Sequence, residues 1–132
     1  MAHILVVEDD AMLAKILTIG LQRADHTIFL VRDGTEAFAY ARDHNPDLIL
    51  LDVMLPGMNG FQILAQLKHH PTTRAIPVLM LTAQSDGASV IAGIDGGADA
   101  YLSKPADLPD IVRRIRVVLQ RPKGRNKHAG TV

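Results

Sequence analysis

The chain has no cysteine, and only 4% of its 132 residues are aromatic. Without cysteine it can form neither disulfides nor thiolate-ligated metal sites, which suits a reducing cytoplasm. No apolar run approaches the roughly 20 residues that span a bilayer. The opening residues, MAH, lack the basic and apolar segments of a secretory leader. We therefore expect a cytoplasmic protein with no membrane interaction and a core of mainly aliphatic side chains.

Charge is balanced over the whole chain but not along it. Residues 121–132 hold four basic residues and no acid, so they carry +4. Because the formal net charge of the chain is +0, residues 1–120 carry −4. An acidic body argues against direct binding of nucleic acid. We predict one domain over residues 1–120 and a basic, flexible tail or linker over residues 121–132, although the basic segment could instead touch an anionic surface.

Five short apolar runs alternate with helical patterns. The runs predict strands at 3–7, 27–31, 47–51, 77–81 and 100–102. Their unbroken apolarity is typical of strands buried on both faces of a parallel sheet. The helical patterns fall near 11–24, 34–44, 60–70, 85–95 and 107–120. Five βα units predict an α/β fold, a doubly wound five-stranded parallel sheet with helices on both faces.

Polar residues follow four of these runs. Glu8 and Asp9 follow the first, Asp52 the third, Thr82 the fourth and Lys104 the fifth. The carboxyl ends of parallel strands lie at one edge of a sheet, where ligands of such folds bind. Carboxylates brought together there repel one another unless a cation lies between them. Oxygen ligands favour a hard ion, and we predict Mg²⁺.

The same residue types suit phosphoryl transfer to a carboxylate. A metal ion and the ammonium of Lys104 would neutralise the charge of the transferring group while Asp52 attacks in line. Each acid taken alone could equally end a strand or cap a helix. All five polar residues at one edge favour a functional site.

Four segments together carry a close resemblance to a known family: ILVVEDD, PDLILLDVMLPGMNGFQIL, PVLMLTA and GADAYLSKP. They resemble the receiver domain of two-component response regulators, the CheY-like family, over roughly residues 3–120. The resemblance implies a flavodoxin-like fold with strand order 2-1-3-4-5. It also implies a phosphoprotein that accepts a phosphoryl group from a histidine kinase or a histidine phosphotransfer protein.

The resemblance assigns roles to individual residues. Asp52 would be the phosphoacceptor. Mg²⁺ would be bound directly by Asp9, by Asp52 and by the backbone carbonyl of Met54, with Glu8 acting through water.

Further roles belong to the switch that the resemblance implies. Lys104 would pair with the phosphoryl oxygens, and Thr82 would move to donate a hydrogen bond to them. Tyr101 would rotate with Thr82, although a half-buried strand aromatic is an equal alternative. Pro105 would follow a cis peptide bond to Lys104.

The chain departs from the commonest family pattern in three places. The acidic pair is Glu8 and Asp9 rather than two aspartates, and Ala106 stands where a phenylalanine is common. Met54 and Gln84 occupy positions that modulate the loss of phosphate in this family. An aspartate-nucleophile phosphatase is a weak alternative, because that class needs an acid at the position of Met54. We expect a signalling domain that only assists its own phosphorylation and dephosphorylation.

Partner surfaces are expected in two places. Residues 85–120 would form the face that changes on phosphorylation and controls a downstream protein or a missing output domain. A homodimer could form through the same face, with ion pairs from Asp99, Arg113 and Arg114. The family docks its kinase on the first helix, and four residues are candidates for that contact: Met12, Leu13, Ile16 and Pro56.

Two further expectations concern the first helix and the end of the third. On the first helix, Leu13, Leu17 and Leu21 form a core stripe. Three further apolar residues are left over as either a docking patch or a thicker core stripe: Met12, Ile16 and Ile19. The pair at positions 69–70, His-His before Pro71, should cap a helix end rather than bind a metal.

Overall fold

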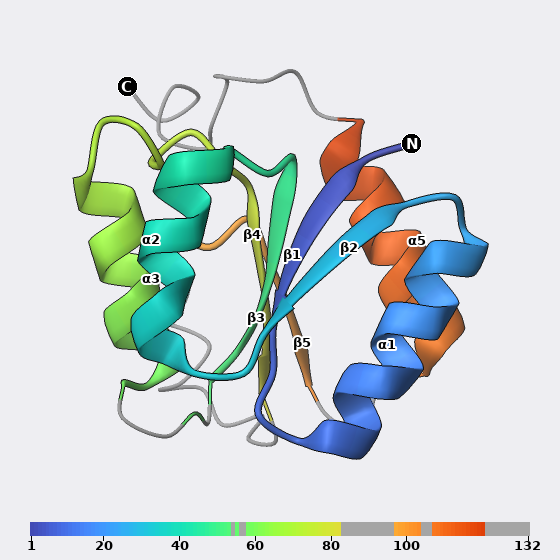
Figure 1. The fold of residues 1–132 in the computed structure, drawn as a ribbon. Coiled ribbons are helices and arrows are strands. Elements are labelled where there is room, and N and C mark those ends of the chain that lie inside the picture. Colours follow the sequence, from blue (N-terminus) through green and yellow to red (C-terminus); the bar gives the residue numbers. More distant parts are fainter. Residues whose placement is uncertain (54, 56–57, 83–96, 104–106, 121–132) are drawn as a thin grey trace.

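The computed structural model describes residues 1–53, 55, 58–82, 97–103 and 107–120. Strands and helices alternate along these residues as far as the fourth strand, which is followed by the fifth strand and the last helix (Figure 1). The elements are β1 (His3–Val7), α1 (Ala11–Arg23), β2 (Thr27–Val31), α2 (Gly34–His44), β3 (Leu48–Asp52), α3 (Gly60–His69), β4 (Val78–Thr82), β5 (Ala100–Ser103) and α5 (Leu108–Leu119). The predicted helix at 85–95 and the predicted tail at 121–132 lie outside the described residues.

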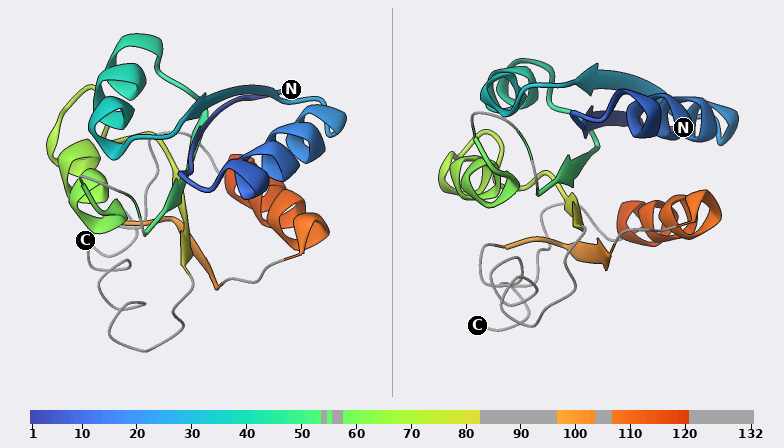
Figure 2. Two further views of the ribbon diagram at one scale, coloured as in Figure 1. Left: turned by 60° about the horizontal axis from the view of Figure 1, so that its bottom comes forward. Right: turned by 90° about the horizontal axis from the view of Figure 1, so that it is seen from below.

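The sheet has the predicted strand order, β2-β1-β3-β4-β5, with every pair parallel. Helices α1 and α5 cover one face, and α2 and α3 cover the other (Figure 2). Alternate residues of each strand therefore enter two separate cores. On β1, Ile4 and Val6 pack towards α1 and α5, whereas Leu5 and Val7 join the opposite core. This confirms the predicted doubly wound α/β fold.

The strand boundaries differ slightly from the prediction, and one difference matters for the site. The third strand spans Leu48–Asp52, so Asp52 is its last residue rather than the residue after it. The fourth strand likewise begins and ends one residue later than predicted, at Val78–Thr82. Both shifts move polar side chains onto the last strand positions, at the carboxyl edge of the sheet.

The expectation that all strands are buried on both faces is wrong for β2. Its side chains alternate between exposed and half-buried, because it lies at the edge of the sheet and pairs only with β1. Phe29 remains exposed, and its ring stacks on Tyr40 of α2 with centroids 4.1 Å apart. Position in the sheet, which the apolar run does not encode, decides the burial of this strand.

Three helix starts are stabilised by side chains that accept backbone N–H groups. Asp10 caps α1, Asp33 caps α2, and Asn59 forms a capping box with Gln62 in α3. Asp107 holds the cap position of α5 but makes no such hydrogen bond. The second residue after it is a proline, which has no N–H to donate, and this removes one of the two usual partners.

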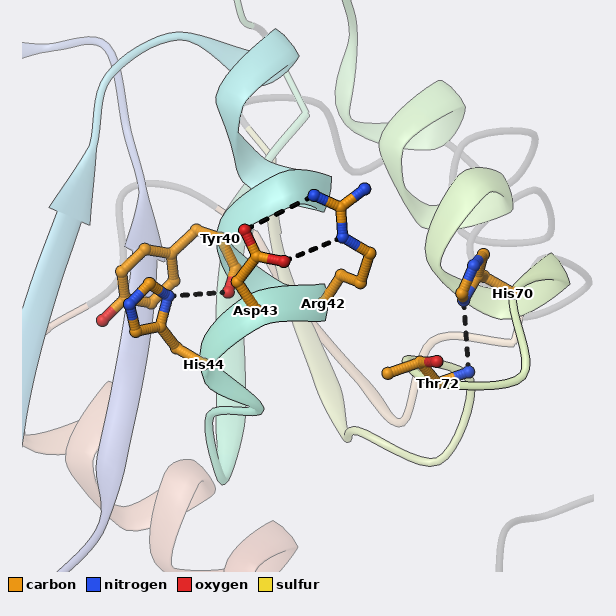
Figure 3. A network of polar contacts seen from close by, with 6 residues as sticks. All are labelled: Tyr40, Arg42, Asp43, His44, His70 and Thr72. Atoms are coloured by element: carbon orange, nitrogen blue, oxygen red, sulfur yellow. Dashed lines mark hydrogen bonds and ion pairs between the residues drawn. The ribbon is translucent and has the colours of Figure 1, made fainter.

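The histidines at the end of α3 act as predicted. The ring of His69 hydrogen-bonds the carbonyl of Ala65 at 2.6 Å. The N–H of Thr72 donates to Nδ1 of His70 at 3.2 Å (Figure 3). Figure 3 also shows a similar contact at the C-terminal end of α2, where Nδ1 of His44 hydrogen-bonds the carbonyl of Tyr40. No helix among the described residues is long and apolar enough to cross a membrane.

The carboxylate of Asp99 makes polar contacts within the chain. Its carboxylate accepts the N–H of Val78 at 2.9 Å and lies 3.6 Å from the ammonium of Lys68. The same ammonium donates to the carbonyl of Ile76 at 2.9 Å. The start of β4 and the approach to β5 are thereby tied to the end of α3. The predicted role of Asp99 in an ion pair across a dimer stays a prediction.

Replacing Asp99 by alanine should lower the free energy of unfolding by about 1–3 kcal/mol, because a buried N–H and an ammonium lose their acceptor. Urea denaturation measures the loss. Asp99→Asn is the matched control, since it keeps a neutral acceptor oxygen and should lose less. An alanine variant as stable as the wild type would show that these contacts do not hold the strands.

Candidate functional site

The two carboxylates of the predicted site that are buried lie at the ends of neighbouring strands. Val7 of β1 pairs with Leu51 of β3, so Glu8 and Asp52 occupy the next position on each strand. Adjacent strands lie about 4.8 Å apart, and residues at the same register position point to the same face. The fold therefore brings these two acids together, although they are separated by more than forty residues in sequence.

Backbone hydrogen bonds continue past both strand ends and hold the acids in place. The N–H of Glu8 donates to the carbonyl of Val31 at 3.0 Å. On the other side of Asp52, the N–H of Val53 donates to the carbonyl of Leu81 at 2.9 Å. The edge that carries the acids is therefore a continuation of the sheet rather than a loose loop.

Burial distinguishes the acids from one another. Glu8 is 2% exposed and Asp52 is 3% exposed, whereas Asp9 and Asp10 are exposed. Charged side chains are almost never this buried unless they are paired, hydrogen-bonded or coordinated. One oxygen of Glu8 accepts the N–H of Asp10 at 3.1 Å. The cost of burying two carboxylates side by side identifies this edge as more than a structural strand end.

The neighbouring acids play different roles. Asp10 accepts the N–H groups of Met12 and Leu13 at 2.9 and 3.1 Å, so it caps α1. Asp9 stands between the buried Glu8 and this cap, and its carbonyl accepts a hydrogen bond from the guanidinium of Arg32 at 3.1 Å. Sequence reasoning missed Arg32, which immediately follows β2 and brings a positive charge to this edge.

Gly60 is a second residue whose role the sequence did not reveal. Its N–H donates to the carbonyl of Val53 at 2.8 Å. A Cβ atom at this position would lie 2.5 Å from the carbonyl oxygen of Asp52. The N-terminus of α3 therefore packs directly on the backbone of Asp52, and only glycine allows this approach. The signal in the sequence is a glycine at the first helical position after an asparagine cap.

The fourth and fifth strands place further predicted residues near this edge. Thr82 ends β4 in register with Ser103 of β5, and Leu81 is in register with Asp52. Tyr101 is half-buried, packs against the core on the α2 and α3 side, and its hydroxyl is buried without a hydrogen-bond partner among the described residues. This position is compatible with both alternatives, so the rotation of Tyr101 stays a prediction.

Several predicted site residues lie outside the described residues. They are Met54, Pro56, Lys104 and Pro105, together with Gln84 and Ala106 at the positions where the chain departs from the family pattern. Their predicted roles, including the cis peptide bond before Pro105, stay predictions.

The donor atoms at this edge fit a hard cation. No group of three or more His, Cys, Asp or Glu in the described part of the chain is placed to hold a metal ion. The prediction needs fewer side chains, namely Asp9 and Asp52 with a backbone carbonyl. Magnesium commonly keeps several waters and uses only one or two carboxylates. The two buried carboxylates in register supply only oxygen atoms, so this edge fits Mg²⁺ rather than a soft metal.

The surface of α1 decides between the two interpretations of its surplus apolar residues. Met12 is 73% exposed, Ile16 is 47% exposed and Ile19 is 41% exposed. The core positions of the helix are instead Ala14, Leu17, Gly20 and Leu21, with Leu13 half-buried. The thicker core stripe is therefore wrong. Met12, Ile16 and Ile19 form an exposed apolar patch, here called the α1 patch, that begins next to the acidic edge.

Sequence comparison finds related proteins over nearly the whole chain. A family model described as the response regulator receiver domain matches residues 4–116. The DNA-binding response regulator MtrA of Mycobacterium tuberculosis is 43% identical over 119 residues, which cover 90% of this chain and 51% of that protein. The chain spans about half the length of the curated relatives it matches.

Solved structures share the fold. The signal receiver domain of a signal transduction histidine kinase from Syntrophus aciditrophicus superposes with a TM-score of 0.84 at 32% identity, covering 96% of this chain and 98% of that one. The receiver domain of a sensor histidine kinase from Pseudomonas aeruginosa, with a magnesium ion coordinated in its active site cleft, gives a TM-score of 0.84 at 25% identity over 91% and 98%.

Replacing Gly60 by alanine should lower the free energy of unfolding by about 1–3 kcal/mol, because the new methyl group overlaps the Asp52 backbone and neither side can yield. Chemical denaturation measures the change. Gly20→Ala is the matched control. Its methyl group would meet only the side chain of Leu108, which can change rotamer, so a smaller loss is expected. Equal stability of Gly60→Ala and the wild type would refute the close approach.

Proposed function

The chain belongs to the family of response regulator receiver domains, and from this we propose that Asp52 is the residue that receives the phosphoryl group. The domain is thus part of a two-component system, and phosphorylation with Mg²⁺ is general to its family. The observation that carries the proposal is the burial of Asp52 at the last position of β3, in register with Glu8. No other described carboxylate combines burial with a position on this strand.

In the proposed reaction, a carboxylate oxygen of Asp52 attacks the phosphorus of a phosphohistidine. The new bond joins this oxygen to phosphorus, and the bond from phosphorus to the histidine nitrogen breaks, which returns the imidazole to the donor protein. A magnesium ion held by Asp9, Asp52 and the carbonyl of Met54 would neutralise charge on the transferring group. Glu8 would hold a water of that ion, and the fixed backbone around Asp52 aligns the attack.

Residues at and after the ends of β4 and β5 would contact the side of the phosphoryl group that faces away from the metal ion. We propose that Lys104 pairs with a phosphoryl oxygen and that Thr82 donates a hydrogen bond to another. Support comes from the pairing of β4 with β5, which puts position 82 beside position 103. Tyr101 lies on β5 two residues before Ser103, and its hydroxyl has no hydrogen-bond partner among the described residues that a rotation would break. The peptide bond before Pro105 would be cis.

The signal would be a change in the face formed by residues 85–120. Moving its equilibrium from mostly inactive to mostly active takes about 5.5 kcal/mol of differential stabilisation. A charged group with new hydrogen-bond acceptors at Asp52 is the source of that energy. A homodimer through this face stays a prediction, and Arg113 already pairs with Asp110 of its own helix.

The domain would act with partners rather than as an independent enzyme. Receiver domains interact with histidine kinases, and we propose that a histidine kinase or a histidine phosphotransfer protein docks on the α1 patch, with Leu13 and Pro56 at its border. We assign residues 1–120 to the receiver unit and residues 121–132 to a flexible tail or linker. The controlled element would be a downstream protein or an output domain, as in MtrA, which is a DNA-binding regulator. The chain would assist only its own phosphorylation and dephosphorylation, in the cytoplasm.

Incubation with acetyl phosphate and Mg²⁺ should add one phosphoryl group, visible by intact-protein mass spectrometry. The adduct should be absent in Asp52→Asn and when EDTA removes the metal. Asp43→Asn, which changes an exposed carboxylate at the opposite end of α2 from this edge, is the matched control and should still be modified. An adduct that persists in Asp52→Asn would refute the assignment of the phosphoacceptor.

Ile16→Glu should slow phosphotransfer from a purified histidine kinase at least about tenfold, because a charge within the apolar patch weakens docking. Modification by acetyl phosphate should be unchanged, since that small donor needs no docking surface. The matched control is Ala39→Glu, which adds the same charge on an exposed position of α2. Kinase transfer at the same rate in both variants would rule out the α1 patch as the docking surface.

A further inference from the structure

A groove of about 460 Å³ lies between α1 and α5, apart from the acidic edge. Its size falls within the range of about 300–1,000 Å³ that is usual for small-molecule sites. The residues that line it are Gly20, Arg23, Ala24, Leu108, Pro109, Val112, Arg113 and Arg116. Three arginines and no acid line this groove, although the chain as a whole has no net charge.

The charge of the groove is not neutralised by its surroundings. Arg113 pairs with Asp110, but Arg23 and Arg116 form no ion pair within the described part of the chain. Because its lining holds three arginines and no acid, the groove is basic.

The remaining surface of the groove is apolar. Gly20, Ala24, Leu108 and Val112 supply small or aliphatic groups. A Cβ atom at Gly20 would overlap the side chain of Leu108, so this side chain packs directly against the α1 backbone. The result is an apolar floor with guanidinium groups at its border.

We propose that this groove binds a nucleotide, with its phosphates on Arg23 and Arg116 and its base or sugar on the apolar floor. The planar guanidinium matches phosphate oxygens in pairs and also stacks on aromatic rings. Neither a purely apolar ligand nor a bare anion would use both parts of the groove. A nucleotide carries negative charge and a flat apolar surface within one molecule of this size.

Charge argues against the other occupants. A second copy placed groove to groove would bring arginines against arginines. Residues 121–132 carry +4 and would be repelled as well. A long polyanion would also meet the rest of the domain, since residues 1–120 carry −4. A compact anion avoids that repulsion.

The inference is independent of the phosphoacceptor. Arg23 ends α1, whereas the acidic edge lies at the opposite end of the same helix, beside its cap Asp10. Arginine variants in the groove should therefore leave the reaction of Asp52 with acetyl phosphate unchanged. This separates a failure of the groove from a failure of the proposed function.

The test is a calorimetric titration of the protein with ATP in EDTA, which prevents metal-dependent binding at the acidic edge. The proposal expects saturable one-to-one binding, weakened at least tenfold in Arg23→Gln/Arg116→Gln. The matched control is Arg42→Gln/Arg74→Gln, which removes the same charge from exposed positions on the other helical layer and its loop. That control should bind within about twofold of the wild type. Thermal melting confirms that both double variants are folded.

Probes for the two halves of the ligand complete the test. Inorganic triphosphate and adenosine should each bind at least tenfold more weakly than ATP, because each uses one part of the groove. Triphosphate binding as tight as that of ATP would overturn the proposal and indicate simple anion attraction. So would equal losses in the two double variants, no saturation by millimolar ATP, or tighter binding of a glutamate-rich peptide.

Discussion

The structure depends on placing two carboxylates, Glu8 and Asp52, at the ends of neighbouring buried strands. Both are almost fully buried, and the register of β1 with β3 leaves them side by side. Such burial is unfavourable unless a cation or hydrogen-bond donors compensate the charge. The backbone around them is correspondingly fixed, by hydrogen bonds from Glu8 and Val53 and by the contact of Gly60 with Asp52. A fold that holds repelling groups together can use a divalent ion and a transferred phosphate to relieve that repulsion.

The two faces of the sheet differ in the helices that cover them and in the surfaces that those helices expose. On one face, α2 and α3 pack on a core that includes Tyr101, and α3 is fixed at both ends, by Gly60 and by the contacts of Lys68. On the other face, α1 and α5 leave an apolar patch near the acidic edge and a basic groove farther along. Asp52, the proposed phosphoacceptor, ends a strand that both helical layers cover, where a change of charge can reach both.

Much of this could be predicted from the sequence, for physical reasons that particular elements illustrate. Strands β1 and β3 are largely apolar runs because they are central, and the acids that follow β1 and end β3 mark the edge of the sheet. The family resemblance then supplied the roles of Asp52 and its neighbours. Strand β2 shows the limit, since its apolar run does not reveal that it lies at the edge. Gly60, Arg32 and the contacts of Asp99 depend on distances between elements, which a linear pattern does not contain.

The central claim is that Asp9 and Asp52 bind one divalent ion at the edge where the phosphoryl group is received. The most direct measurement is the anomalous scattering of a crystal grown with Mn²⁺ in place of Mg²⁺. The account predicts a single strong peak within coordination distance of a carboxylate oxygen of Asp52 and of Asp9, with Glu8 one water away. A peak elsewhere, or an Asp52 side chain directed into the apolar core with no metal beside it, would contradict the account.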